Sequence, residues 1–226
     1  LLINNISLLE INIEKFISLS YLQLLVVVIN KKHLKLYKKI KNKYKNVFFV
    51  EGSSSRQKSA FNALKFLKKY SCKYVMIHDA ARPFISSKLI DKLYKKLQKV
   101  KTAVIPVVKI QDTIKLCNMN KVKKNINRDN LFLTQTPQLF EYKTLHKTYL
   151  NNEEKLDSFT DDAQIFEKSN LIIHTVLGDI ENIKITTNKD WFNKINMLKE
   201  NFTTRVGHGF DTHKLIKGKS ITLFGI

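Results

Sequence analysis

The sequence is poor in cysteine, proline and glycine: its 226 residues include two cysteines, three prolines and six glycines. The two cysteines, Cys72 and Cys117, supply neither a disulfide framework nor the spacing of a metal site, and they fit a reducing compartment. Long apolar runs are missing too. The longest, Leu24–Ile29, is far too short to cross a bilayer and indicates a buried strand, so no membrane partner is expected.

Acidic residues are also few, 19 against 40 basic ones, which gives a net charge of +21. Such a charge favours nucleic acid, because clustered cations release counterions from phosphates. The lysines are dispersed, however, over helix-like stretches such as residues 31–45 and 92–101, as is typical of solvated helix faces. We therefore expect no nucleic-acid partner. The competing hypothesis, a nucleic-acid-binding protein, calls for clustered arginines and aromatic stacking positions.

Arginine is the scarce basic residue, and its planar fork is suited to holding phosphate or carboxylate with two hydrogen bonds. Arg82 lies three residues after Asp79, just past the apolar run Tyr74–Ile77. The two alanines between them, Ala80 and Ala81, let a ligand approach the backbone. Ligands of open α/β sheets bind at such strand ends, so the pair predicts a site. The alternative is a local ion pair that shapes the turn.

Strand-like and helix-like segments alternate over residues 1–200, which predicts βαβ units and a mainly parallel sheet flanked by helices. Ser7 and Glu10 form a capping box before the first helix. The polar stretch 111–127 predicts a protruding β-arm. A second α/β domain is expected to begin in residues 201–226. The expected strands are 24–29, 47–50, 74–77, 103–108, 131–133 and 171–176, and the expected helices include 58–69, 142–150, 189–199 and others starting near residues 8, 31, 86 and 160.

Three further places carry candidate chemistry. The segment Gly52–Arg56 lies between a strand and a helix, where backbone N–H groups and the helix dipole favour an anion, although a serine helix cap is an equal alternative. Ser59 follows one turn into that helix and faces either ligand or solvent. Thr160 could simply cap a helix. Lys184 interrupts an apolar pattern near the expected end of the sheet.

Together these segments resemble the methylerythritol phosphate cytidylyltransferase family, nucleotidyltransferases of non-mevalonate isoprenoid synthesis. The resemblance covers about residues 8–199. It is carried by Gly52-x-x-x-Arg56-Gln57-x-Ser59, Val75-x-x-His78-Asp79-Ala80-Ala81-Arg82-Pro83, Ala103-Val104-x-Pro106-Val107, Asp112-Thr113-Ile114-Lys115, Arg128-x-x-Leu131, Thr136-Pro137-Gln138, Thr160-Asp161-Asp162-Ala163 and Asn182-Ile183-Lys184-Ile185-Thr186. It implies a Rossmann-like nucleotidyltransferase that transfers a cytidylyl group from CTP, with Mg²⁺, to 2-C-methyl-D-erythritol 4-phosphate and releases pyrophosphate. A cytidylyltransferase acting on ribitol phosphate or another polyol phosphate is the alternative in this fold class.

The resemblance also implies residue roles. Asp79, Arg82 and Lys184 would be catalytic and would contact the acceptor. The other acceptor residues would be Thr113, Arg128 and Thr160, and the nucleotide side would comprise Gly52, Ser53, Ser54, Ser59, Asp79 and Ala80. The β-arm would reach a neighbouring subunit, which implies a homodimer.

Two departures from the family pattern affect these expectations. The family's glycine-rich triphosphate loop would precede residue 1, so we expect residues 1–226 alone to bind CTP poorly and turn over negligibly. Ser53 also stands where the family often has a second glycine.

Beyond the first domain, Asp211 and His213 lie two apart, so on an extended segment they can share one metal; a turn without metal is the alternative. The segment resembles the opening strand of the cyclodiphosphate synthase family, trimeric lyases in which these residues bind zinc or a similar divalent metal. Bifunctional enzymes join the two activities in this order. Because the third ligand is absent, we expect weak metal binding at most. The resemblance implies a bacterial cytoplasmic protein, or a plastid stromal one where a transit peptide precedes the chain.

Overall fold

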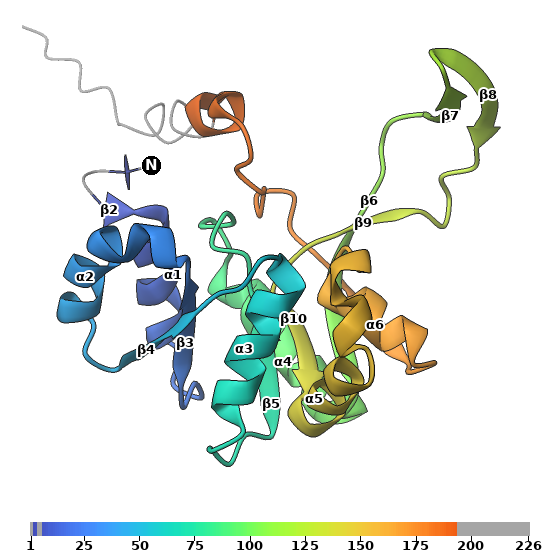
Figure 1. The fold of residues 1–226 in the computed structure, drawn as a ribbon. Coiled ribbons are helices and arrows are strands. Elements are labelled where there is room, and N and C mark those ends of the chain that lie inside the picture. Colours follow the sequence, from blue (N-terminus) through green and yellow to red (C-terminus); the bar gives the residue numbers. More distant parts are fainter. Residues whose placement is uncertain (1, 4–5, 194–226) are drawn as a thin grey trace, which may run out of the picture.

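The computed structural model describes residues 2–3 and 6–193, whose central strands and flanking helices form an α/β fold (Figure 1). One sheet has the order β11-β6-β10-β5, with β9 also paired to β6, and β3 and β4 form a parallel pair. The strands are β1 (Leu2–Ile3), β2 (Ile6–Ser7), β3 (Leu25–Ile29), β4 (Val47–Glu51), β5 (Tyr74–Ile77), β6 (Ala103–Lys109), β7 (Ile114–Asn118), β8 (Lys121–Ile126), β9 (Phe132–Thr134), β10 (Gln138–Glu141) and β11 (Ile173–Leu177).

The strands β5, β6 and β11 share one direction, because β10 is antiparallel to both of its neighbours and β11 is parallel to β6. The predicted α/β fold with mainly parallel central strands is therefore confirmed. The antiparallel strand β10, inserted between β5 and β6, was not predicted.

Most of the helices begin at side-chain caps. Ser7 Oγ accepts the Glu10 N–H at 3.2 Å, while the Glu10 carboxylate accepts the Ser7 N–H at 3.0 Å, which confirms the predicted capping box. The last cap corrects a prediction: α6 is capped by Asp161, whose carboxylate accepts the Gln164 N–H, and not by Thr160. The helices are α1 (Leu8–Ile17), η1 (Lys31–His33), α2 (Leu34–Lys43), α3 (Arg56–Leu67), α4 (Ser87–Val100), α5 (Tyr142–Asn151), η2 (Glu153–Ser158) and α6 (Asp162–Lys168), and residues 188–193 are also helical.

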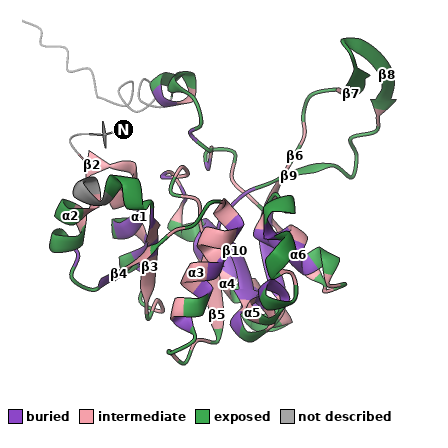
Figure 2. Ribbon diagram, viewed as in Figure 1, coloured by how far each residue is buried: buried purple, intermediate pink, exposed green. Residues whose placement is uncertain are grey.

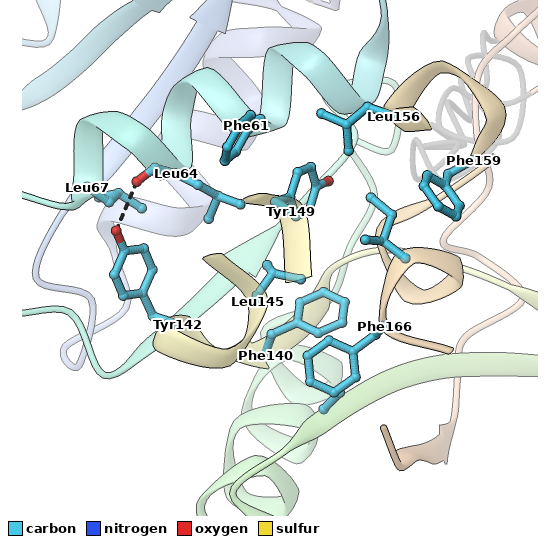
Figure 3. Packing of buried hydrophobic residues seen from close by; sticks show 12 residues of the cluster. Phe61, Leu64, Leu67, Phe140, Tyr142, Leu145, Tyr149, Leu156, Phe159 and Phe166 are labelled. Carbon is cyan, nitrogen blue, oxygen red and sulfur yellow. Dashed lines mark hydrogen bonds between the residues drawn. The ribbon is translucent and has the colours of Figure 1, made fainter. Parts of the chain in front are cut away.

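The pleat of the central strands sends neighbouring residues to opposite faces of the sheet. In β10, Phe140 packs with residues of α3, α5 and α6, whereas Leu139 packs with residues of α1 and α4. Figure 3 shows the first of these clusters, in which the Tyr142 hydroxyl donates to the Leu64 carbonyl at 2.9 Å. Both faces of β10 are therefore buried, and the loops at its ends are held against a packed core.

The predicted β-arm is confirmed as a hairpin of β7 and β8 that protrudes from the body (Figure 1). Its side chains are nearly all exposed (Figure 2). The turn residues Met119 and Asn120 have φ values of 45° and 61°, the left-handed conformation that tight two-residue hairpin turns require.

The C-terminal part of the chain carries two of the predicted features, Lys184 and the pair Asp211 and His213. No strand forms at residues 182–186, so Lys184 lies in an irregular segment rather than within a strand. Residues 201–226, with Asp211 and His213, lie outside the described part of the chain. Within the described part, no helix is long and apolar enough to span a membrane.

Candidate active site

Asp79 follows β5 and is the centre of a charged cluster. Its Oδ1 lies 3.1 Å from Arg56 Nε and its Oδ2 lies 2.9 Å from Lys184 Nζ. Burial raises the pKa of Asp79, but Arg56 and Lys184 outweigh burial and hold that pKa below its ordinary value of 3.8. The structure thus brings together Asp79 and Lys184, which lie far apart in the sequence, and keeps the carboxylate ionised.

Arg56 connects this cluster to a second carboxylate. Its Nη1 lies 2.8 Å from Oδ2 of Asp162, which is fully buried at the start of α6 and also accepts a hydrogen bond from the Tyr149 hydroxyl. Burial lowers the pKa of Arg56, yet the two carboxylates raise it on balance. Burial raises the pKa of Asp162, and Arg56 offsets part of that effect. Arg56 therefore bridges two carboxylates, as its planar fork permits.

From the sequence, Arg56 was only the last residue of the candidate anion-binding segment Gly52–Arg56, and Asp162 was only a member of the family pattern that begins at Thr160. The available signal was the scarcity of arginine, since Arg56 is one of only four in the chain. The burial of Asp162 against Tyr149 had no local signal, because it depends on the packing of α6 on α5.

His78 fixes the loop that carries Asp79 and Arg82. Its Nε2 lies 3.0 Å from both Asn12 Oδ1 and the Arg82 carbonyl oxygen, and its Nδ1 lies 3.1 Å from Thr136 Oγ1. Because both partners of Nε2 are acceptors, we assign the ring proton to Nε2, and the Thr136 hydroxyl donates to Nδ1. Burial lowers the pKa of His78 to about 4, so the ring is neutral at pH 7. The Asp79 N–H donates to Thr136 Oγ1 at 3.0 Å, which completes the network.

Arg82 does not use its side chain to pair with Asp79 across the turn. Its Nη1 donates to the Asn182 carbonyl at 2.7 Å, and burial lowers its pKa. The Ile185 N–H donates to the Ala81 carbonyl at 2.8 Å. The loop after β5 and the segment that carries Lys184 are therefore joined at two points.

The loop after β4 closes on the first turn of α3. The Gly52 N–H donates to the Ile29 carbonyl at 2.8 Å, and the Ser53 N–H donates to Ser59 Oγ at 2.9 Å. A Cβ atom on Gly52 would lie 3.0 Å from Ser59 Oγ, tighter than nine in ten real Cβ contacts. Ser55 caps α3 by accepting the Lys58 N–H. The helix-cap interpretation is therefore correct for Ser55, while Ser53 and its neighbour Ser54 remain exposed.

The other predicted residues lie apart from this cluster. Thr113 and Arg128 are exposed at the two ends of the arm, and Arg128 donates to the Gln111 carbonyl. Thr160 is exposed, and both its N–H and its hydroxyl bond to Gln164 Oε1. Within the described residues, none of the three forms a hydrogen bond or ion pair with Asp79.

The described residues contain no group of three or more histidine, cysteine, aspartate or glutamate side chains that could hold a metal ion. Both oxygens of Asp79 are occupied by cationic side chains. The donor set does not fit a metal held by the protein alone. It fits an anionic ligand, which Arg56, Lys184 and Arg82 can attract.

Comparison with known proteins identifies similar chains. The family model described as 2-C-methyl-D-erythritol 4-phosphate cytidylyltransferase matches residues 1–199. The chain is 41% identical over 202 residues to the bifunctional enzyme IspD/IspF of Pelagibacter ubique, covering 89% of this chain and 51% of that relative. It is 36% identical over 190 residues to the 2-C-methyl-D-erythritol 4-phosphate cytidylyltransferase of Thermosipho melanesiensis, covering 82% of each. The crystal structure of 4-diphosphocytidyl-2C-methyl-D-erythritol synthase from Anaerococcus prevotii superposes with a TM-score of 0.79 and 32% identity, covering 88% of each chain.

Proposed function

Because the chain belongs to the 2-C-methyl-D-erythritol 4-phosphate cytidylyltransferase family, we propose that it transfers a cytidylyl group from CTP to 2-C-methyl-D-erythritol 4-phosphate. A phosphate oxygen of the acceptor attacks the α-phosphorus of CTP, and pyrophosphate leaves. Mg²⁺ enters with CTP as part of the substrate complex. The chain spans about half the length of the bifunctional relatives it matches, so the second activity of a longer parent, cyclisation to the 2,4-cyclodiphosphate, is part of the proposal.

One observation carries the proposal: Asp79, Arg56 and Lys184 form a compact charged cluster at the end of β5. Phosphoryl-type transfers need positioning and charge neutralisation more than covalent catalysis. In the proposed mechanism Lys184 neutralises charge on the reacting phosphates. Asp79 orients Lys184 and accepts a hydrogen bond from an acceptor hydroxyl, and Arg82 binds the acceptor. Neutral His78 holds the loop that presents Asp79 and Arg82.

The remaining predicted residues complete the proposed site. We assign the nucleotide side to the loop after β4 and to the backbone after Asp79, that is to Gly52, Ser53, Ser54, Ser59 and Ala80. On the acceptor side, we assign Thr160 to the site of its own subunit, the one that also contains Asp79 and Lys184. Thr113 and Arg128 are exposed on an arm that protrudes from the body. This supports the proposal that they serve the site of a partner subunit in a homodimer.

We propose three further assignments from the resemblance to the family. Asp211 and His213 would contribute two ligands to the zinc, or similar metal, of a trimeric cyclase domain in the parent. The domain boundary would lie near residue 200. The protein would work in the cytoplasm.

The test is cytidylyl transfer from CTP to 2-C-methyl-D-erythritol 4-phosphate with Mg²⁺, followed by mass spectrometry of the product. Two proteins are assayed. The first is the chain as it stands, and the second is an extended chain in which the N-terminal segment of the Pelagibacter relative precedes it. We expect negligible turnover by the former and clear turnover by the latter. Lys184→Met should abolish most of that turnover, whereas Lys95→Met, an exposed lysine of α4, should leave it unchanged.

Two results would reject the assignment. The first is an extended chain that makes no cytidyl ester, and the second is a preference for ribitol 5-phosphate as acceptor. Tight binding of random duplex DNA with a steep salt dependence would favour the nucleic-acid alternative instead.

A further inference from the structure

Gln135 precedes Thr136 and is buried, with 5% of its surface exposed. Both ends of its side-chain amide bind the turn after β11, residues 178–182. Gln135 Nε2 donates to the Asp179 carbonyl at 2.8 Å and to the Asn182 carbonyl at 3.3 Å. Gln135 Oε1 accepts the Asp179 N–H at 3.2 Å and an Asn182 Nδ2 hydrogen at 3.5 Å. The amide thus binds both ends of one turn with all of its polar atoms.

Gly178 provides an independent observation on the same contact. A Cβ atom at position 178 would lie 2.5 Å from Gln135 Oε1, a separation that real Cβ atoms essentially never show. The next contacts of that Cβ would be Val108 Cγ1 at 3.2 Å and the Val107 carbonyl at 3.3 Å. Any side chain at position 178 would therefore force Gln135 out of its place.

The turn held by Gln135 is connected directly to the charged cluster. The Asn182 carbonyl accepts a hydrogen bond from Arg82 Nη1 at 2.7 Å, and Asn182 Nδ2 donates one to the Thr136 carbonyl at 2.9 Å. Two residues later, Lys184 contacts Asp79. Because residues 182–186 belong to no sheet, the position of Lys184 depends on such side-chain contacts rather than on a ladder of backbone hydrogen bonds.

We propose that Gln135 is a positioning residue, which fixes the turn 178–182 so that the Asn182 carbonyl meets Arg82 and Lys184 meets Asp79. Gln135 touches no reacting group, and it acts through the segment it holds. Its importance for catalysis rests on the cytidylyl transfer proposed above. The positioning itself is measurable without any substrate.

Amide hydrogen exchange on the full chain tests the positioning. The Ile185 N–H, bonded to the Ala81 carbonyl, reports on the segment carrying Lys184. We expect Gln135→Ala to accelerate exchange at Ile185 about tenfold or more, because several buried hydrogen bonds are lost together. Thr148→Ala, which removes a hydroxyl buried to 4% within α5, is the control and should leave Ile185 unchanged. Unchanged protection of Ile185 in Gln135→Ala would overturn the proposal.

A double-mutant cycle keeps the test decisive if Gln135→Ala proves unstable. Gly178→Ala should by itself accelerate exchange at Ile185, since the new methyl displaces Gln135. With Gln135→Ala already present the closest contact of the new methyl is gone, and only those at 3.2 Å and 3.3 Å remain, so Gly178→Ala should accelerate exchange at Ile185 much less in that background than in the unmodified chain. Additive effects of the two substitutions would show that Gly178 and Gln135 act separately, which overturns the proposal.

The catalytic consequence is measured on the extended chain. Gln135→Ala should lower kcat about tenfold or more while changing the KM for CTP little, because the loop that contains Gly52 is untouched. An unchanged kcat would reject Gln135 as a positioning residue, even with faster exchange at Ile185. A wild-type chain without any transfer would instead reject the proposed function, and exchange at Ile185 would then decide the positioning.

Discussion

Replacing Arg56 by lysine tests whether one planar guanidinium is needed to hold two carboxylates. Arg56 reaches Asp79 through Nε and Asp162 through Nη1, at 3.1 Å and 2.8 Å. A lysine carries one ammonium on a shorter stem and can pair closely with only one of the two carboxylates. Since Asp162 is fully buried, an unpaired Asp162 would be a charge without compensation.

The magnitude follows from the burial of the two partners. Removing one partner of a buried ion pair costs about 3–5 kcal/mol. Arg56 is 31% exposed, and lysine would keep one contact, so we expect a smaller loss of about 2–3 kcal/mol at pH 7. For a chain of this size that corresponds to a fall in Tm of roughly 5–10 °C. The loss should shrink as the pH is lowered, because protonation of Asp162, whose pKa burial already raises, removes the unpaired charge.

Urea unfolding followed by the fluorescence of the single tryptophan, Trp191, measures this loss. The matched control is Arg128→Lys on the exposed arm, for which we expect a change within about 0.5 kcal/mol. Asp162→Asn, alone and combined with Arg56→Lys, should reveal a coupling of about 1 kcal/mol or more between the two residues. An Arg56→Lys variant as stable as Arg128→Lys, or strictly additive effects with Asp162→Asn, would refute the bridging role.

Two further predictions concern pH. Asp79→Asn should destabilise the fold by about 1–2 kcal/mol at pH 7. Since Arg56 and Lys184 hold the pKa of Asp79 below 3.8, its stabilisation is fully present above that pH and is lost as the pH falls from 3.8 through the lowered pKa; a difference between the urea midpoints of the two proteins that does not shrink between pH 5 and pH 3 would contradict this. His78 has a pKa near 4 in the fold against 6.5 when unfolded, so stability should fall by about 3 kcal/mol from pH 6.5 to 4. His78→Gln should remove most of that slope, and equal slopes for both proteins would show that His78 is not buried as a neutral ring.

Most of the fold was predictable because the signals for its elements are local. The strand Tyr74–Ile77 agrees with its prediction at both ends, and Ser7, Ser55 and Ser86 cap helices as their residue types favour. The strand β10 was missed for a physical reason. Its four residues give almost no alternation of polar and apolar side chains, and it is a strand because β5 and β6 pair with it on both sides.

The candidate site was only partly predictable, because many of its contacts join segments that lie far apart in the sequence. Asp79 and Arg82 follow a strand that the sequence reveals, so their place at its end could be inferred. The contacts of Asp79 could not be, because both its partners come from other segments of the chain. Lys184 was expected near the end of the sheet, but it is held by side-chain contacts around Gln135 and Asn182. Such contacts leave no periodic pattern in the sequence.

Three of the four arginines of this chain also connect separate segments of the structure, in addition to any role in ligand binding. In the described part of the chain, each arginine joins its own segment to another: Arg56 to two carboxylates, Arg82 to the Asn182 carbonyl and Arg128 to the Gln111 carbonyl. Lysine pairs such as Lys65 with Glu153 are half exposed, and pairs of this kind contribute little. Lysine thus supplies general surface charge, whereas these three arginines connect separate segments, and Arg56 does so with two of its nitrogens. Substitution of Arg56 or Arg82 by lysine preserves the net charge. We therefore expect any effect of these substitutions to come from the changed geometry around Asp79.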